Sequence, residues 1–477
     1  GTIVKFDGGR IEAVDGGNFI AEGDEGHVIV FTSKADDRYG GSGTFDTNND
    51  DSRGTSEASP VAGDWGGLFI GPLSQASIDN ALITFGGGIN RGEGQFAGFN
   101  PVSVSQGDLR LTNSIIESNA DGTGGTAPSD RYGRGANTSA AIFVSGSQPT
   151  IVGNIIRDNA GSAITINANA LTADLLNDQG RQRNPVNQVI DYPSNQGPLV
   201  RANKLSGNGT NGLDVRGATL TTQSVWDDTD IVHVLRSEIV VPDLHLFGGL
   251  TLHSSPNESL VVKLQGGNAG FTASGRPLDM VDRIGGTVQI VGQPGFPVIL
   301  TSLRDDTVGA GFQADGAASY DTNGGAGVPA AADWRSIKLD SFSNDRNVDM
   351  AYEREATNTS APGINATPLT AQYLGLLAAA DKSSDENLRL GFTLQGTLSQ
   401  RNDIDVFSFE GSAGSQVWID IDRSSTALDS VVELVDTSGN VLARSDYSLD
   451  EQTAVVINFV SDPETVKANP LSSQAVG

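Results

Sequence analysis

The chain of 477 residues has no cysteine, only four histidines and only two methionines. Without cysteine there can be no disulfides, thiolate catalysis or cysteine-ligated zinc, and so few imidazoles leave little material for histidine chemistry. Lysine and arginine number 30 against 58 aspartates and glutamates, which gives a formal net charge of −28. Such a charge repels nucleic acid and anionic lipid, whereas it favours solubility and divalent cations.

Long hydrophobic runs are also missing. The most apolar run, residues 373–380, is far shorter than the roughly 18 residues that a membrane-spanning helix needs, so we expect no transmembrane segment. The start shows no signal peptide, because residues 2–6 already read as a strand. We therefore expect a piece of a longer chain, which leaves room for a secretion signal outside it.

What the chain does have is glycine and short alternating apolar runs. Glycine accounts for 60 residues and proline for 18, and hydrophobic residues make up 37%. This composition is typical neither of collagen nor of a disordered chain. It favours many short strands joined by tight turns.

A duplication organises the first two thirds of the sequence. The segment "GGNFIAEGDEGHVIVFTSKADD" (16–37) resembles "GGTVQIVGQPGFPVILTSLRDD" (285–306), and the Asp-Trp pair at 64–65 recurs at 333–334 with the same offset of 269 residues. Upstream, "VKFDGG" (4–9) resembles "VKLQGG" (262–267). Matches that resume after loop-sized gaps indicate a whole unit followed by the opening of a second one.

A smaller pattern recurs inside the first unit: "SIIESN", "NIIRDN" and "NKLSGN", which end at Asn119, Asn159 and Asn208. Asparagine tolerates left-handed backbone angles, and its amide can bond to the equivalent residue one layer away, so we expect a ladder of stacked asparagines. The 40 residues from the first to the second suit two coils of about 20 residues. The 49 residues to the third need an insertion, which we place in the polar stretch 177–198.

This combination resembles the right-handed parallel β-helix, in which short strands wind into coils and neighbouring coils bury each other's apolar side. The predicted fold class is therefore all-β, a parallel β-helix solenoid followed by a small antiparallel domain. An array of β-sandwiches is the alternative. We expect one β-helix unit over 1–250 and a partial second unit over 251–354.

The C-terminal third changes character. Residues 355–384 read as a linker with a short helix at 373–380, and residues 462–477 as a tail or interdomain arm. Between them, "DIDVFSFEGSAGSQVWIDID" and "LDSVVELVDTSGNVLARSD" make residues 385–461 resemble the bacterial pre-peptidase C-terminal domain. That resemblance implies a small antiparallel β-sandwich or jelly roll on an exported protein, without catalysis.

Four further segments carry a wider resemblance: "FTSKADDRYGGSGTFDTNND", "GDWGGLFIGP", "VWDDTDIVHVLRSEI" and "ESLVVKL". With the duplication, they make the chain similar to units of the giant cell-surface proteins of planctomycete-type bacteria. This resemblance implies an extracellular or cell-surface location and a repeat architecture, and it implies no reaction.

The loop "DTNNDDSRGTSE" is the best metal candidate. Asp46, Asn48, Asp50 and Glu57 stand at positions 1, 3, 5 and 12 of an EF-hand-like loop, the spacing that wraps hard oxygen ligands around Ca²⁺. The loop departs from that pattern at position 6, where Asp51 replaces the required glycine, and no flanking helices are expected. A solvated acidic loop is the alternative.

Paired aspartates recur at the same place in both copies, as Asp36-Asp37 and Asp305-Asp306. Such pairs can bind Ca²⁺, and one member can serve as a base whose pKa its neighbour raises. The alternative is a turn in which the carboxylate caps the end of the preceding strand, and identical placement in a duplicate favours this structural interpretation.

Other candidates carry structural alternatives. Trp65, Trp334 or Tyr132 would suit sugar stacking, but a tryptophan more often packs in a core. Asp403 and Asp405 are among several aspartates of the C-terminal domain that suit either a Ca²⁺ site or a solvated face. The segment "VWDDTDIVHV" suggests acid–base or metal chemistry, although its apolar residues read as a buried strand; its polar residues are Asp227, Asp228, Asp230 and His233.

Three functions remain open. A structural or adhesive extracellular protein, a repeat unit of a fibre or surface layer whose partners are other copies or neighbouring units, fits the duplication and the lack of a nucleophile constellation. A secreted polysaccharide lyase or glycoside hydrolase is compatible with the fold, which does not fix function. A carbohydrate-binding module that contacts cell-surface polysaccharide is the third. Ca²⁺ is the only cofactor that we expect.

Overall fold

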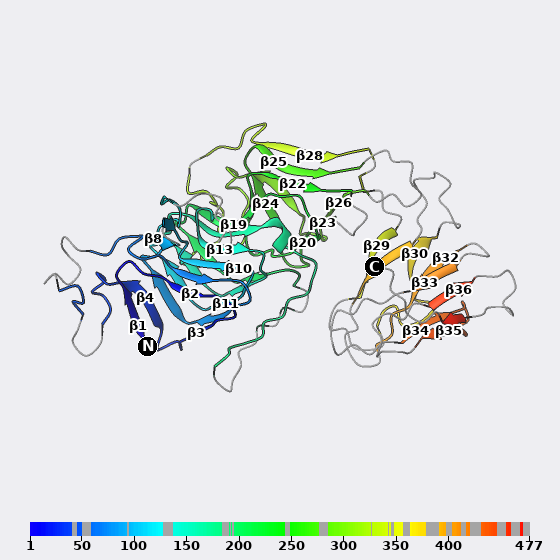
Figure 1. Cartoon of the computed structure of the whole chain (residues 1–477). Coiled ribbons are helices and arrows are strands. Elements are labelled where there is room, and N and C mark those ends of the chain that lie inside the picture. The colour runs from blue at the N-terminus through cyan, green and yellow to red at the C-terminus, as the bar shows by residue number, and fades with distance from the viewer. Residues whose placement is uncertain are drawn as a thin grey trace. The chain divides into compact units, whose positions relative to one another are not determined.

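The computed structural model describes residues 1–40, 45–49, 59–92, 95–126, 137–183, 190, 192, 195–243, 249–275, 285–325, 327–341, 343–344, 348–355, 363–377, 391–396, 403–411, 416–419, 431–445, 455–458 and 468–470. The chain divides into two compact units. The first comprises residues 1–274 and 286–340, and the second comprises residues 275–285 and 341–477. Figure 1 shows that both are built from short strands.

The first unit is a set of parallel sheets. A six-stranded sheet has the order β1 (Ile3–Phe6), β4 (Ile29–Ser33), β7 (Ala81–Thr84), β12 (Ile115–Glu117), β15 (Ile155–Arg157), β18 (Lys204–Ser206). A nine-stranded sheet has the order β2 (Ile11–Ala13), β5 (Leu68–Ile70), β10 (Val102–Ser105), β13 (Ala140–Ser145), β16 (Ser162–Asn167), β19 (Thr210–Arg216), β21 (His233–Leu235), β24 (Val261–Leu264), β27 (Ile299–Ser302). A five-stranded sheet has the order β17 (Leu199–Arg201), β14 (Thr150–Val152), β11 (Asp108–Thr112), β6 (Gln75–Asp79), β3 (Asn18–Glu22).

Two three-stranded parallel sheets complete this arrangement. One has the order β20 (Gln223–Trp226), β23 (Gly249–His253), β26 (Thr287–Val291), and the other β22 (Glu238–Val241), β25 (Gly266–Ala273), β28 (Trp334–Leu339). An antiparallel ribbon joins β8 (Ile89–Gly92) to β9 (Gln95–Gly98), and a short 3₁₀ helix, η1, spans Ala168–Ala170.

Successive strands visit the sheets in rotation. The strands β1, β2 and β3 lie in three different sheets, and β4, β5 and β6 then lie beside them in the same order. We call one such round a coil. Because each coil adds one parallel strand to each sheet, its inward side chains meet the equivalent side chains of the next coil.

The core consists of these stacked aliphatic side chains. In the five-stranded sheet, Ile78, Leu111, Ile151 and Val200 pair in register from strand to strand, and each is at most 1% exposed. Neighbouring parallel strands lie roughly 4.8 Å apart, so such residues are in contact along the whole row. Alternation along each strand sends the polar side chains to the outer face.

The predicted asparagine ladder is confirmed. The side chain of Asn119 donates to that of Asn159 at 2.9 Å, which donates in turn to Asn208 at 2.8 Å. A second ladder, between Asn154 and Asn203, has the same form at 3.0 Å. These amides are buried, so each bond also removes an otherwise unsatisfied group from the interior.

The coil length expected from the asparagine spacing is wrong. The strands β12 and β15 pair directly, so the 40 residues between their asparagines form one coil with a long connection, because inserted loops lengthen the sequence without adding a layer. The insertion expected at 177–198 does lie in the connection between β16 and β17.

The duplication is repeated in three dimensions. Paired strands β1 and β4 correspond to β24 and β27, with Lys5 opposite Thr32 in the first copy and Lys263 opposite Thr301 in the second. The strands β2, β3 and β5 likewise correspond to β25, β26 and β28. Both copies belong to the first compact unit, and β24 and β27 continue the nine-stranded sheet that begins with β2.

In the second unit, some strands are antiparallel and some are parallel. Antiparallel pairs join β33 (Gln416–Ile419), β36 (Val455–Asn458) and β37 (Ala468–Pro470), and β34 (Val432–Val435) with β35 (Val441–Ser445). Parallel pairs join β29 (Val348–Tyr352) with β31 (Gly391–Gln395), and β30 (Gln372–Leu376) with β32 (Phe407–Glu410). The short helix expected from residue 373 is wrong up to residue 376, because β30 occupies this segment and pairs with β32.

Candidate functional site

The outer face of the five-stranded sheet carries the largest buried polar network among the described residues with side-chain contacts. The register places Glu22 of β3, Asp79 of β6 and Thr112 of β11 in one row across the sheet. The neighbouring row holds Ser77 of β6 and Arg110 of β11. Because side chains two apart on a strand share a face, these five groups all point away from the apolar core.

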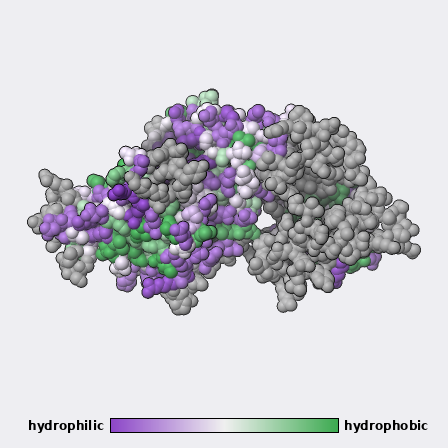
Figure 2. All heavy atoms as spheres, in the orientation of Figure 1, coloured by the Kyte–Doolittle hydropathy of each residue, from purple (hydrophilic) through white to green (hydrophobic). Residues whose placement is uncertain are grey.

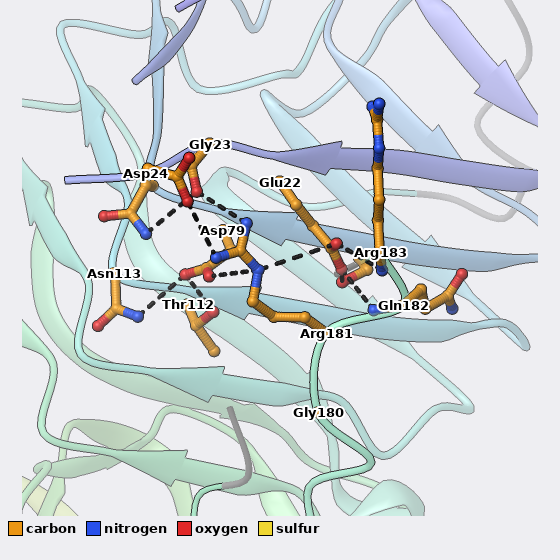
Figure 3. A network of polar contacts seen from close by, with 12 residues as sticks. Glu22, Gly23, Asp24, Asp79, Thr112, Asn113, Gly180, Arg181, Gln182 and Arg183 are labelled. Atoms are coloured by element: carbon orange, nitrogen blue, oxygen red, sulfur yellow. Dashed lines mark hydrogen bonds and ion pairs between the residues drawn. The ribbon is translucent and has the colours of Figure 1, made fainter. Parts of the chain in front are cut away.

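Part of the insertion between β16 and β17 covers this face, and Arg181 is its central contact. We call described residues 171–183 the arm. Figure 3 shows the Arg181 guanidinium between three carboxylates. Its nitrogens lie 3.3 Å from Asp79, 3.3 Å from Asp24 and 3.8 Å from Glu22, and it donates to the Gly23 carbonyl at 2.9 Å.

The arm backbone adds a second set of bonds. The N–H groups of Gln182 and Arg183 donate to the two carboxylate oxygens of Glu22, at 2.6 and 2.7 Å (Figure 3). Nearer the start of the arm, Asp178 accepts two hydrogen bonds from Arg110, at 2.7 and 3.0 Å. An acid of the arm thus meets a base of the sheet, and a base of the arm meets acids of the sheet.

Burial determines what this network does. Asp79 is 0% exposed and Arg181 7%. Removing one partner of a buried ion pair leaves an uncompensated charge, which costs more than the pair itself gains. The network therefore fastens the arm to the sheet. While the arm is in place, Asp79 is shielded from solvent and from any substrate.

A second acidic cluster follows β20, in the segment for which acid–base or metal chemistry was considered. Arg201 is its central cation: it donates to Thr229 at 2.9 Å and lies 3.4 Å from Asp230. Asp227 accepts from the backbone N–H of Gln196 at 2.9 Å. The aspartates of this segment therefore anchor the connection and β17 to the turn before β21.

Burial dominates the protonation of this cluster. It raises the pKa of Asp227 to about 7, and it raises that of Asp228 further because the Asp227 charge lies beside it. For both acids the folded pKa lies above the unfolded one, so their contribution to stability is lost as pH rises through this range. Burial lowers the pKa of His233 to about 3, which keeps this ring neutral and stacked on Trp226 at 5.1 Å.

The duplicated aspartates occupy equivalent turns. Asp36 accepts from Thr32 at 2.5 Å and from the backbone N–H of Arg38 at 3.2 Å. Asp305 accepts from Thr301 at 2.6 Å and from the backbone N–H of Thr307 at 3.0 Å. These bonds close a turn after β4 and β27, the alternative considered for this pair. Neither arrangement tests whether the pair binds Ca²⁺.

The second aspartate of each pair lies near a duplicated lysine. Lys5 is 4.0 Å from Asp37 and donates to the Phe45 carbonyl at 2.9 Å. Lys263 donates to the equivalent carbonyl, that of Tyr320, at 2.7 Å. The charges of Asp306 and Asp305 only partly offset the burial that lowers the pKa of Lys263. The lysine thus fastens the following loop to the sheet in both copies.

The proposed EF-hand-like loop is only partly described. Asp46 and Asn48 are half-buried, and they follow the segment that Lys5 holds. Asp50 and Glu57 lie outside the described residues. The Ca²⁺ prediction for this loop therefore stays a prediction.

Trp65 packs in the core and is not a sugar platform. It is 0% exposed, stacks on Phe6 at 4.2 Å and donates from its indole nitrogen to the Thr84 carbonyl at 2.8 Å. Its counterpart Trp334 is half-buried against the same core. Tyr132 lies outside the described residues.

Sequence reasoning missed two groups. Arg181 gave no signal, because its partners come from β3 and β6, about 100 residues or more away in the sequence. In the second unit, carboxylate oxygens of Glu353, Glu355 and Asp405 lie within 4.8 Å of one another. Burial, a hydrogen bond with Glu353 and nearby acids raise the pKa of Asp405 to about 7. Asp405 thus meets glutamates of a segment expected to be a linker.

No family model matches the chain, and neither the curated proteins nor the solved structures contain a significant match. The resemblances to planctomycete-type surface proteins and to the pre-peptidase C-terminal domain therefore stay predictions. Among the described residues, no helix is long and apolar enough to cross a membrane.

Proposed function

We propose that the chain is a structural or adhesive extracellular protein, a unit of a fibre or surface layer whose task is to extend and connect. The strand rotation of the first unit supports a right-handed parallel β-helix as its architecture. In this proposal the C-terminal unit is a small accessory domain of the exported protein, and Ca²⁺ acts as a counter-ion that lets acidic copies approach each other.

The observation that carries the proposal is what the chain does with its buried charges. Asp79 and Glu22 are held by the arm, the aspartates before β21 are held by Arg201 and backbone donors, and Asp36 is held by Thr32 and Arg38. A catalytic acid has to reach its substrate, whereas these carboxylates are committed to fastening loops and coils. That use of charge suits a rigid connecting element.

Sedimentation velocity and negative-stain electron microscopy of the purified chain test the proposal. The net charge of −28 opposes association, so we expect oligomers that grow with protein concentration and that increase when salt or millimolar Ca²⁺ screens the charge. Mg²⁺ at equal ionic strength separates a Ca²⁺-specific effect from screening. A chain that stays monomeric at high concentration in all these buffers would remove the support for self-assembly.

A further inference from the structure

The two copies differ in what lies beside their first strands. In the second copy, β24, β25 and β26 each have a neighbour on both sides: β21 and β27, β22 and β28, and β23 with the nearest described neighbour on one side only for β26. The equivalent strands of the first copy, β1, β2 and β3, are each the end strand of their sheet on the side where β21, β22 and β23 lie in the second copy. A whole neighbouring coil is therefore missing from the first copy.

Burial registers that missing coil. Val262 is 0% exposed, whereas its equivalent Val4 is only half-buried. Phe271 is 0% exposed, whereas its equivalent Ile11 is half-buried. These first-copy side chains are apolar and pack against the core from its edge. Figure 2 shows hydrophobic residues gathered in the part of the first unit where Figure 1 labels β1 to β3.

The last coil of the same unit has the complementary shape. The strands β26, β27 and β28 are the opposite end strands of their sheets among the described residues. On β26, Ile290 faces the core opposite Leu252, which is 0% exposed, yet Ile290 itself is 45% exposed. An inward apolar side chain that nothing covers is a place where another coil would stack.

We infer that the coil β1–β3 is a docking surface for the coil β26–β28 of a second copy of this chain; the inference rests on the proposed function and specifies its contact. The two coils are matched because β27, β28 and β26 are copies of β4, β5 and β3. Docking therefore puts β27 beside β1, β28 beside β2 and β26 beside β3, all parallel, as in the rest of the sheets. Main-chain hydrogen bonds along three edges and the half-buried apolar residues form the contact.

This contact is head-to-tail, because the two surfaces that meet are different. A heterologous contact of this kind does not close on itself unless the rotation happens to form a ring, so it builds open filaments. The register of the existing pairs fixes the alignment. Ile20 of β3 and Gln289 of β26 are equivalent positions, and docking in the repeat's own register sets them opposite each other.

The test uses cysteine cross-linking in a chain that has no cysteine of its own. The variant Ile20→Cys/Gln289→Cys places two thiols on neighbouring parallel strands, at a separation that a disulfide can bridge. Under mild oxidation we expect a ladder of covalent oligomers on non-reducing gels, at the concentrations where sedimentation shows association. Each single variant should give dimers at most.

A matched control replaces the second position with a residue away from the end coil. Ile20→Cys/Leu73→Cys also carries two accessible thiols, since Leu73 is 84% exposed, and it should give no ladder above the single-variant background. Oligomers by sedimentation without the Ile20–Gln289 cross-link would overturn this inference and leave the proposed function standing. Absence of oligomers and of the cross-link would overturn both.

Discussion

The same strand pattern occurs twice in this chain, once with a neighbouring coil before it and once without. In the second copy Val262 and Lys263 are 0% exposed, while Val4 and Lys5 in the first copy are half-buried. The turn that follows is nevertheless the same, with Asp36 and Asp305 in equivalent hydrogen bonds. The comparison teaches that the local turn comes from the local sequence, whereas burial depends on which coil stacks next.

The arm is a second difference between the copies. Arg181 contacts Glu22 in the first copy, and the equivalent position in the second copy is Val291. An ion pair that would need a carboxylate at that position cannot form there. The first copy has thus gained an outer fastening where the second has an apolar residue.

The largest expected effect comes from cutting this fastening. Arg181→Gln leaves Asp79 and Glu22 buried without their cation, which should lower the free energy of unfolding by about 3–5 kcal/mol. Urea unfolding measures the loss, and limited proteolysis should show cleavage in the arm before the rest of the unit. The control is Arg183→Gln, which makes the same charge change at an exposed side chain. Equal stability of the two variants would contradict a fastening role for Arg181.

A matched pair of valines gives the next effect. Val262→Ala removes buried methyl groups and leaves a cavity, so we expect a loss of about 2 kcal/mol in urea unfolding of the dilute chain. Val4→Ala removes the same groups from a half-buried position and should cost about 1 kcal/mol or less. At concentrations where copies associate, Val4→Ala should also weaken association, and Val262→Ala should not. Equal costs in dilute solution would mean that the end coil is as well covered as the interior.

The sequence was sufficient for features that repeat locally. Asn119, Asn159 and Asn208 predicted their ladder because each lies at the same place in a short motif, and stacking follows once the coils are in register. The all-β class and the duplication followed in the same way from short-range pattern. The coil length did not, since the connection between β12 and β13 hides within the 40-residue spacing.

Contacts between distant segments were beyond the reach of the sequence. Arg181 lies more than 150 residues from Glu22 and about 100 from Asp79, and no motif links the three. Trp65 could be assigned to packing or to sugar binding until its burial was known. The aspartates before β21 read as a turn on the surface, yet the structure buries them around Arg201 because the connection after η1 folds back over them.

The smallest expected effect separates the two duplicated turns by pH. Hydrogen bonds from Arg38 and Thr32 outweigh burial and lower the pKa of Asp36, and bonds from Thr301 and Thr307 lower that of Asp305. With a folded pKa below the unfolded one, each carboxylate stabilises the fold above about pH 4, and this contribution is lost as pH falls through the folded pKa.

Asp36→Asn should therefore cost about 1–2 kcal/mol at pH 7, because it weakens charged hydrogen bonds at a buried site. Asp305→Asn should cost less than about 1 kcal/mol, because solvent reaches that carboxylate and screens it. Urea unfolding from pH 7 down to pH 3 measures both, and the difference between each variant and the parent should shrink toward the acid end. A cost that persists at pH 3 would assign the effect to the shape of the turn and not to its charge. Equal costs for the two variants would show that the turn is insulated from the difference in burial that separates the copies.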